Sequence, residues 1–276
     1  MILVMTVALA IGISVIQRSL SDISTSSKVE QSSRAYSAAE AGIEKAISLS
    51  SNIGKIDLGN NSSIEGVLKT DIPEPGKAIE YPPLSREEVA HVWLADPKSA
   101  ADPPDEFYIP ANGTLDVFWG NSATDKAALE LTLTYYQTGE YKMRKWYLDY
   151  QDYNRNNNFD YDSTICFSDG RVLSSALSGE VKYQCFKRLG NGQGQNNGPL
   201  PSGLMLLRAR LLYNTTAQPF AVAPEIGAAL PPQASIYIST GISGQTQRQV
   251  KVFKLDKVVP PFFDYAIFSA DEINKQ

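Results

Sequence analysis

The first sixteen residues, MILVMTVALAIGISVI, contain no charged side chain, and no proline separates them from the segment that follows. Burying a large apolar side chain stabilises a protein by about 1.5–3 kcal/mol, so leaving this run in water would cost on the order of 20 kcal/mol. We therefore expect it to lie in lipid or against other chains. The large apolar residues of the run are Met1, Ile2, Leu3, Val4, Met5, Val7, Leu9, Ile11, Ile13, Val15 and Ile16.

Three other interpretations of this run can be compared. A cleaved signal peptide has basic residues before its apolar core and a small-residue cleavage site after it; here no basic residue precedes the run, and the Ala8-x-Ala10 triplet lies inside it. A simple membrane anchor needs about 20 apolar residues, which is longer than this run, but it stays open as an alternative. A buried core helix is disfavoured, because a 50-residue helix is about 75 Å long whereas a compact chain of this length has a radius of gyration near 19 Å.

The segment from Arg18 to Ser50 continues the helix. It contains no proline, and its one glycine is Gly42. Apolar residues recur in it at steps of three and four, which places them on one stripe of a helix, and Leu20 and Ile23 extend that stripe towards the N-terminus. We expect the stripe to pack onto a globular head while the uncharged end projects. The predicted packing residues are Tyr36, Ala39, Ile43, Ala46 and Ile47.

Both ends of the sequence resemble a known family. The uncharged N-terminus, the polar SLSDISTSSKVEQSS and the block RAYSAAEAGIEKAI at residues 34–47 are similar to type IV pilin-like proteins, especially the PilX-type group. The tail KVVPPFFDYAIFS at residues 257–269 resembles the ending common in that group. The resemblance covers roughly the first 50 and last 20 residues, and the AAEAG block is its more specific part.

The resemblance implies an extracellular filament at the cell surface. Such a subunit is held in the inner membrane, is trimmed by a prepilin peptidase, and then joins a helical filament with copies of itself and other pilins. Many pilins carry a glutamate near the mature N-terminus, whereas this sequence has no acid before Asp22. Its absence is commoner in minor components of the family. We therefore expect a structural filament subunit and keep, as the alternative, a membrane-anchored minor pilin, pseudopilin or exported adhesin module.

The sequence after residue 50 predicts a β-rich region. Apolar and polar residues alternate in ALELTLTYY, the pattern of a half-exposed strand, and the turn QTGE joins it to YKMRKWYLD as a hairpin. The fold class we expect is α+β and type IV pilin-like: a long protruding N-terminal helix (1–50) packed against an antiparallel β-rich head (51–276). A boundary between two subdomains near residue 105 or 190 stays open. The predicted strands are 115–119, 128–136, 141–149, 180–186, 203–214, 234–240 and 249–255.

Two cysteines, Cys166 and Cys185, stand 19 residues apart. In an exported protein, this number and spacing favour a disulfide, and a bridge over such a loop stabilises the fold by about 3 kcal/mol. The alternative is two buried thiols.

The best chemical motif is DYNRNNNFD at residues 152–160. Its oxygen donors fall at every second residue and match positions 1, 3, 5, 7 and 9 of a calcium loop, with Asn157 in place of the usual glycine. Ser163 stands where a closing glutamate would be, and Asp149 or Asp162 could substitute. The alternative is an asparagine-rich turn that caps its own backbone. The predicted Ca²⁺ ligands are Asp152, Asn154, Asn156, Asn158 and Asp160.

The composition disfavours catalysis and nucleic-acid binding. The net charge is −5, and the chain has one histidine, no GxSxG motif and no phosphate-binding glycine motif. A carboxylate pair such as Asp102 with Asp105 fits a solvated face better than a glycosidase site. The sequence therefore predicts no enzyme, no nucleic-acid partner, and no cofactor beyond a candidate Ca²⁺.

Overall fold

The computed structural model describes residues 2–121, 124–150, 155–160, 164–255 and 257; among the first ten residues it describes the side chains of Met5 and Leu9. The described residues form one helix and thirteen strands. They divide into two compact units. The helix unit comprises Met1–Thr70 and Ser235–Lys254, and the sandwich unit comprises Asp71–Ala234 and Leu255–Gln276. Each unit is described by itself.

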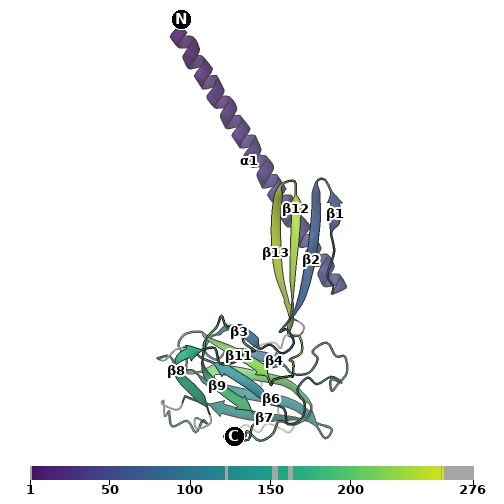
Figure 1. Cartoon of the computed structure of the whole chain (residues 1–276), viewed down its shortest axis with the longest axis vertical. Coiled ribbons are helices and arrows are strands. Elements are labelled where there is room, and N and C mark those ends of the chain that lie inside the picture. The colour runs from purple at the N-terminus through teal and green to yellow at the C-terminus, as the bar shows by residue number, and fades with distance from the viewer. Residues whose placement is uncertain (1, 122–123, 151–154, 161–163, 256, 258–276) are drawn as a thin grey trace, which may run out of the picture. The chain divides into compact units, whose positions relative to one another are not determined.

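The helix unit consists of α1 (Ile2–Leu49) and one four-stranded sheet in the order β1-β2-β12-β13 (Figure 1). Its strands are β1 (Ile56–Gly59), β2 (Ser62–Ile72), β12 (Ala234–Ser243) and β13 (Thr246–Leu255). The helix ends where Ser50 adopts a left-handed backbone with φ of 51°. Strands β2 and β12 are hydrogen-bonded neighbours, although the whole of the sandwich unit's main segment lies between them in sequence.

Small residues allow α1 to approach this sheet closely. A Cβ atom added at Gly241 in β12 would lie 2.1 Å from the Ala35 carbonyl oxygen of the helix. A Cβ added at Gly42 would lie 2.4 Å from Ser239 Oγ and 3.0 Å from Ile64 Cγ2. A side chain at Gly241 would collide with the helix backbone, whereas a side chain at Gly42 would have to displace the Ser239 and Ile64 side chains of the sheet.

The sandwich unit contains two sheets packed face to face, in the orders β4-β10-β6-β7 and β3-β11-β5-β9-β8. The first holds β4 (Val89–Trp93), β10 (Leu204–Leu212), β6 (Ala128–Gln137) and β7 (Glu140–Leu148). The second holds β3 (Ile79–Leu84), β11 (Gln218–Pro224), β5 (Leu115–Trp119), β9 (Tyr183–Leu189) and β8 (Ile165–Arg171).

The antiparallel pairs of the sandwich are nested in sequence. Strand β3 pairs with β11, β4 with β10, β5 with β9 and β6 with β7. A hairpin ribbon that folds over on itself in this way, with its pairs alternating between two sheets, is a jelly roll. The innermost pair turns at Thr138 and Gly139, both with positive φ (54° and 83°), so the predicted QTGE hairpin is present.

The core lies between the two sheets and includes Trp119, Leu131, Trp146, Leu207 and Phe220, all almost completely buried. A second cluster covers the outer face of the five-stranded sheet. In it, Leu173, Ala176 and Leu177 pack on Phe118 and Ala221. The segment 172–182 therefore closes this face, which explains why β5 and β11 are buried along their whole length.

The expected fold class is wrong. We expected an α+β, pilin-like fold with the helix packed against one head, whereas the described residues form three mostly antiparallel sheets with a single helix. The core of the sandwich unit contains no helical residue. The units divide near residues 70 and 234 rather than near 105 or 190. Each of the seven predicted runs overlaps a strand, but β1, β2, β3, β4, β8 and β11 were not predicted.

Candidate assembly interface

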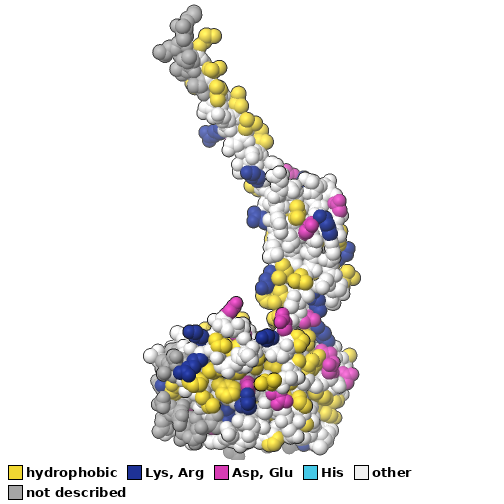
Figure 2. Space-filling model, in the orientation of Figure 1, with side chains coloured by type: hydrophobic (Ala, Val, Ile, Leu, Met, Phe, Trp, Pro, Cys, Tyr) yellow, Lys and Arg dark blue, Asp and Glu magenta, His cyan; other side chains and the backbone are white. Residues whose placement is uncertain are grey.

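The helix α1 has a covered part and an uncovered part. From Ala35 onward, one stripe of small and apolar residues is buried against β2 and β12. Before Gln31 every described side chain is exposed. Nine large apolar side chains lie in that uncovered part, with exposed fractions from 48% at Ile13 to 77% at Met5 (Figure 2). They are Met5, Leu9, Ile11, Ile13, Val15, Ile16, Leu20, Ile23 and Val29.

Five of these residues follow a coiled-coil repeat. Leu9, Ile13, Ile16, Leu20 and Ile23 are separated by alternating steps of four and three, so they form one continuous seam along the helix. Ser21 and Thr25 lie on the opposite side. This heptad seam, defined by its five residues, is the geometry with which one helix packs against another.

The buried stripe differs from the predicted one. Ala39, Ile43 and Ala46 are buried, and Ile47 packs at the edge of their cluster, whereas Tyr36 is half exposed. Leu20 and Ile23 belong to the uncovered part instead of extending the packing stripe. The residues that replace them are Ala35, Ala38 and Gly42, and the last two belong to the small-residue block AAEAG.

Polar contacts fix the point where the covered part begins. Arg248 Nε of β13 donates to Ser32 Oγ at 2.8 Å, and Arg34 Nη1 donates to the Asn60 carbonyl oxygen at 3.2 Å. Arg34 also pairs with Glu30, one helical turn away, at 2.6 Å. These contacts hold the helix to the sheet from about Glu30 onward, and every described side chain that precedes Gln31 in sequence is exposed.

A search of the described residues for a helix sufficiently long and apolar to cross a membrane finds none. Of the eleven apolar residues predicted for assembly, the structure describes the side chains of Met5, Leu9, Ile11, Ile13, Val15 and Ile16, all of them exposed. Met1, Ile2, Leu3, Val4 and Val7 have side chains outside the described set.

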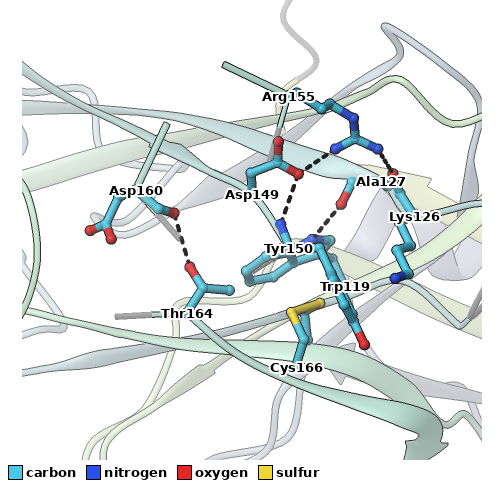
Figure 3. Close-up of a disulfide and its surroundings, with 10 residues drawn as sticks. Trp119, Lys126, Ala127, Asp149, Tyr150, Arg155, Asp160, Thr164 and Cys166 are labelled. Atoms are coloured by element: carbon cyan, nitrogen blue, oxygen red, sulfur yellow. Dashed lines mark hydrogen bonds and ion pairs between the residues drawn. A yellow bond between two sulfur atoms is a disulfide. The ribbon is translucent and has the colours of Figure 1, made fainter. Parts of the chain in front are cut away.

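The sandwich unit holds the predicted disulfide. Cys166 of β8 and Cys185 of β9 lie directly opposite each other and are bonded. Near the bond, Trp119 Nε1 donates to the Ala127 carbonyl oxygen at 3.0 Å (Figure 3). The alternative of two buried thiols therefore does not hold for this structure.

Three of the five predicted calcium ligands, Asn156, Asn158 and Asp160, lie within the described residues. Asp152 and Asn154 lie outside the described residues, as does Asp162. Asn156 and Asn158 are exposed and adopt left-handed backbone, a conformation expected at Asn157. Asp160 is buried, and its Oδ2 lies 3.5 Å from Lys187 Nζ, which is itself 1% exposed, and accepts from the Gln195 amide at 2.9 Å.

The carboxylate of Asp149 also has an ion-pair partner and a hydrogen-bond donor within the protein. The carboxylate pairs with Arg155, which donates through its other terminal nitrogen to the Lys126 carbonyl oxygen at 2.6 Å (Figure 3). The same carboxylate accepts from Asn157 Nδ2 at 2.9 Å. Burial lowers the pKa of Lys187, while the Asp160 carboxylate counteracts that shift. An added Ca²⁺ would thus compete with two of the protein's own cations. Within the described ranges no group of three or more His, Cys, Asp or Glu could hold a metal, and the calcium site stays a prediction.

Comparison of the chain with protein-family models, curated proteins and solved structures finds no match.

Proposed function

We propose that this chain is a structural subunit of a pilus-like extracellular filament that assembles through the uncovered part of α1. In this proposal the partners are copies of the same chain and other pilins. Before assembly the uncharged end is held in the inner membrane, and the filament then lies at the cell surface.

The observation that carries the proposal is the set of nine exposed apolar side chains on one helix. Their burial would stabilise an assembly by roughly 15–25 kcal/mol per chain, before the cost of association is subtracted. The heptad seam supplies a geometry for that burial, because alternating steps of three and four allow like helices to interdigitate. Lipid or a bundle of like helices are the two environments that offer such contact.

A second candidate function is a displayed binding module on a minor subunit or anchor. It is favoured by the chain topology: the main segment of the sandwich unit is one continuous insertion, Asp71–Ala234, between two neighbouring strands of the helix unit's sheet. Insertions of this kind leave the host unit able to fold and assemble by itself. The two candidates differ in how much of a filament the chain makes up.

Filaments sheared from the producing cells would test the proposal. Mass spectrometry of purified filaments should find this chain in bulk for a main subunit and in traces for a minor one. Electron microscopy should show filaments that disappear when Ile16 and Leu20 are replaced by Gln. Retention of the chain in the membrane fraction, with filaments intact in its absence, would contradict the proposal.

A further inference from the structure

The helix unit is basic, although the chain as a whole is acidic. Its two segments, Met1–Thr70 and Ser235–Lys254, contain nine Lys and Arg residues against six Asp and Glu, whereas the net charge of the chain is −5. Two of the basic side chains, Lys28 of α1 and Arg248 of β13, line one groove of about 510 Å³. The groove is built from α1, β13 and the turn before β13, all within the helix unit. We call it the basic groove.

The residues that line the basic groove are of one chemical kind. Among the residues that the structure describes, no carboxylate and no large apolar side chain lines it. Besides the two cations, the six lining side chains end in a hydroxyl or an amide, among them Ser24, Ser27 and Thr246. Ammonium, guanidinium, hydroxyl and amide groups all donate hydrogen bonds. The basic groove therefore favours a negatively charged ligand with several acceptor oxygens.

Contacts within the helix unit orient part of the groove. Arg248 Nε donates to Ser32 Oγ at 2.8 Å, which fixes the guanidinium group relative to α1. Thr246 Oγ1 donates to Gln31 Oε1 at 3.5 Å, so the start of β13 is tied to the same turn of the helix. Among the described residues, neither Lys28 nor Arg248 has a carboxylate partner, and both side chains are exposed. Both cations are thus available to a ligand.

The acidic residues of the helix unit near this level of α1 lie on other sides of the helix. At about 100° per residue, Ser24 and Lys28 lie on one side of α1, whereas Asp22 and Glu30 lie roughly 120° or more away from both. Glu30 is also paired with Arg34 at 2.6 Å. Strands β12 and β13 contain no Asp or Glu. The positive charge of the basic groove is therefore not cancelled by these neighbours.

The groove side of α1 becomes apolar one turn closer to the N-terminus. Leu20 precedes Ser24 by four residues and Ile13 precedes it by eleven, so both lie on the groove side of the helix, and both are exposed. The helical rise places Leu20 about 6 Å from Ser24 along the axis. The headgroup layer on one side of a bilayer is also about 5–7 Å thick. When lipid surrounds the uncharged end of α1, the basic groove lies level with the headgroups.

We infer that the basic groove, through Lys28 and Arg248, binds the phosphate of an anionic phospholipid. The ammonium and guanidinium groups hold the phosphate oxygens, the hydroxyl of Ser24 donates to the same group, and the acyl chains lie along Leu20 and Ile13. The inference rests on the part of the proposed function that holds the uncharged end of α1 in the membrane before assembly. It does not rest on the filament itself.

The test uses the full chain in neutral detergent micelles and counts bound lipid by native mass spectrometry. Phosphatidylglycerol is the anionic probe, phosphatidylcholine with the same acyl chains is the matched zwitterionic probe, and inorganic phosphate is the probe without acyl chains. We expect phosphatidylglycerol to bind about tenfold or more tightly than phosphatidylcholine, with a preference that weakens as salt is added. Equal binding of the two lipids, or binding of inorganic phosphate as tight as that of phosphatidylglycerol, would overturn the inference.

Variants locate the lipid preference in the groove. Replacing Lys28 and Arg248 together by Gln should abolish the preference, because both cations of the groove are lost. The matched control replaces Lys45 of α1 and Lys251 of β13 by Gln; both are exposed residues of the same unit outside the groove, so the net charge changes equally and the preference should remain. Lys28→Gln alone should weaken the preference several-fold, and it repeats the test if the Arg248 variant misfolds. Equal losses in groove and control variants would overturn the inference.

The result can be separated from that of the filament test. Lipid preference is measured on the unassembled chain, whereas the filament proposal is tested on material sheared from cells. Filaments that contain a chain without lipid preference would overturn this inference alone. A lipid preference in a chain that is absent from filaments would overturn the filament proposal alone and support the basic groove as a lipid site.

Discussion

The helix unit and the sandwich unit differ in how many of their large apolar side chains are buried. The sandwich unit buries its large apolar core between two sheets and covers a further sheet face with its own segment 172–182. The helix unit buries a smaller cluster, Ile43, Ala46, Ile64, Val67 and Tyr237, together with small residues of α1, and leaves nine large apolar side chains of the same helix exposed. Among the residues that the structure describes, the sandwich unit therefore covers its own apolar core, whereas the helix unit covers only the part of α1 from about Gln31 onward.

If the chain assembles as proposed, folding and assembly should depend on different residues. Changes in the heptad seam should alter assembly and leave both folded units intact. Changes in the sandwich should alter its stability and leave assembly intact. The three tryptophans, Trp93, Trp119 and Trp146, all lie in the sandwich unit, so their fluorescence reports on it alone, while the helical circular dichroism reports on α1.

The largest expected effect comes from the seam. Replacing Ile16 and Leu20 by Gln should cost assembly about 3–6 kcal/mol, which is a rise of more than a hundredfold in the concentration needed to assemble. The control replaces Ser21 and Thr25, on the opposite side of the helix, by Gln. Pelleting assays measure assembly, and tryptophan fluorescence should be unchanged in both variants. Equal pelleting of the seam variant and the control would show that the seam is not the contact.

The next largest effect compares a glycine that faces the covered part of α1 with a glycine in the uncovered part of the helix. Gly241→Val should destabilise the helix unit by about 3 kcal/mol or more, because the new side chain would collide with the helix backbone at Ala35. Gly12 has no atom within 4 Å of an added Cβ, so Gly12→Ala should leave that unit's stability the same or slightly higher. Thermal melts followed by circular dichroism compare them. A Gly241→Val protein as stable as the parent would contradict the close packing of helix and sheet.

Removing the disulfide should affect the sandwich unit alone. Replacing Cys166 and Cys185 together by Ala should lower its free energy of unfolding by about 3 kcal/mol, since a closed loop of 19 residues is released. Denaturant titration followed by tryptophan fluorescence measures the loss. Pelleting of this variant should match the parent; a loss of assembly would mean that the two units are not independent.

A smaller effect depends on pH and His91. Partial burial and the Arg208 guanidinium, directly across on β10, lower the pKa of this imidazole to about 4, from 6.5 in the unfolded chain. Between these pH values the unfolded state binds more protons, so stability should fall as the pH drops from 6.5 to 4. After allowance for solvent exposure we expect about 1–2 kcal/mol. His91→Gln should remove this part of the pH dependence; an unchanged profile would contradict it.

The smallest expected effect is that of calcium. Because Lys187 and Arg155 already lie on the Asp160 and Asp149 carboxylates, we expect millimolar Ca²⁺ to stabilise the sandwich unit by about 1 kcal/mol or less. Melts with Ca²⁺ and with a chelator measure this shift, with Asp160→Asn as the control that abolishes it. Identical melting midpoints in Ca²⁺ and chelator would rule out a structural ion.

Local patterns in the sequence predicted local structure well. The uncharged run, the missing prolines and the three-and-four spacing indicated one long helix. Alternation located β6, and the QTGE turn linked it to β7 as a hairpin. The cysteine spacing indicated the disulfide. Each of these signals arises within about 20 residues of chain, where periodicity and turn chemistry act directly.

The arrangement of the strands could not be predicted in this way. The contact of Gly241 with Ala35 joins residues some 200 positions apart, and nothing near either residue signals it. The pairing of β2 with β12 across the inserted sandwich is equally remote. Strand β11 carries no alternation because both of its faces are buried, so a search for half-exposed strands missed it.

The central claim is that the uncovered part of α1 must be buried by other chains or by lipid. Sedimentation velocity of the full chain, recorded as detergent is diluted away, tests it most directly. We predict large assemblies for the parent chain and a marked shift to smaller species when Ile16 and Leu20 are replaced by Gln. A parent chain that stays monomeric and monodisperse in detergent-free buffer would contradict the claim.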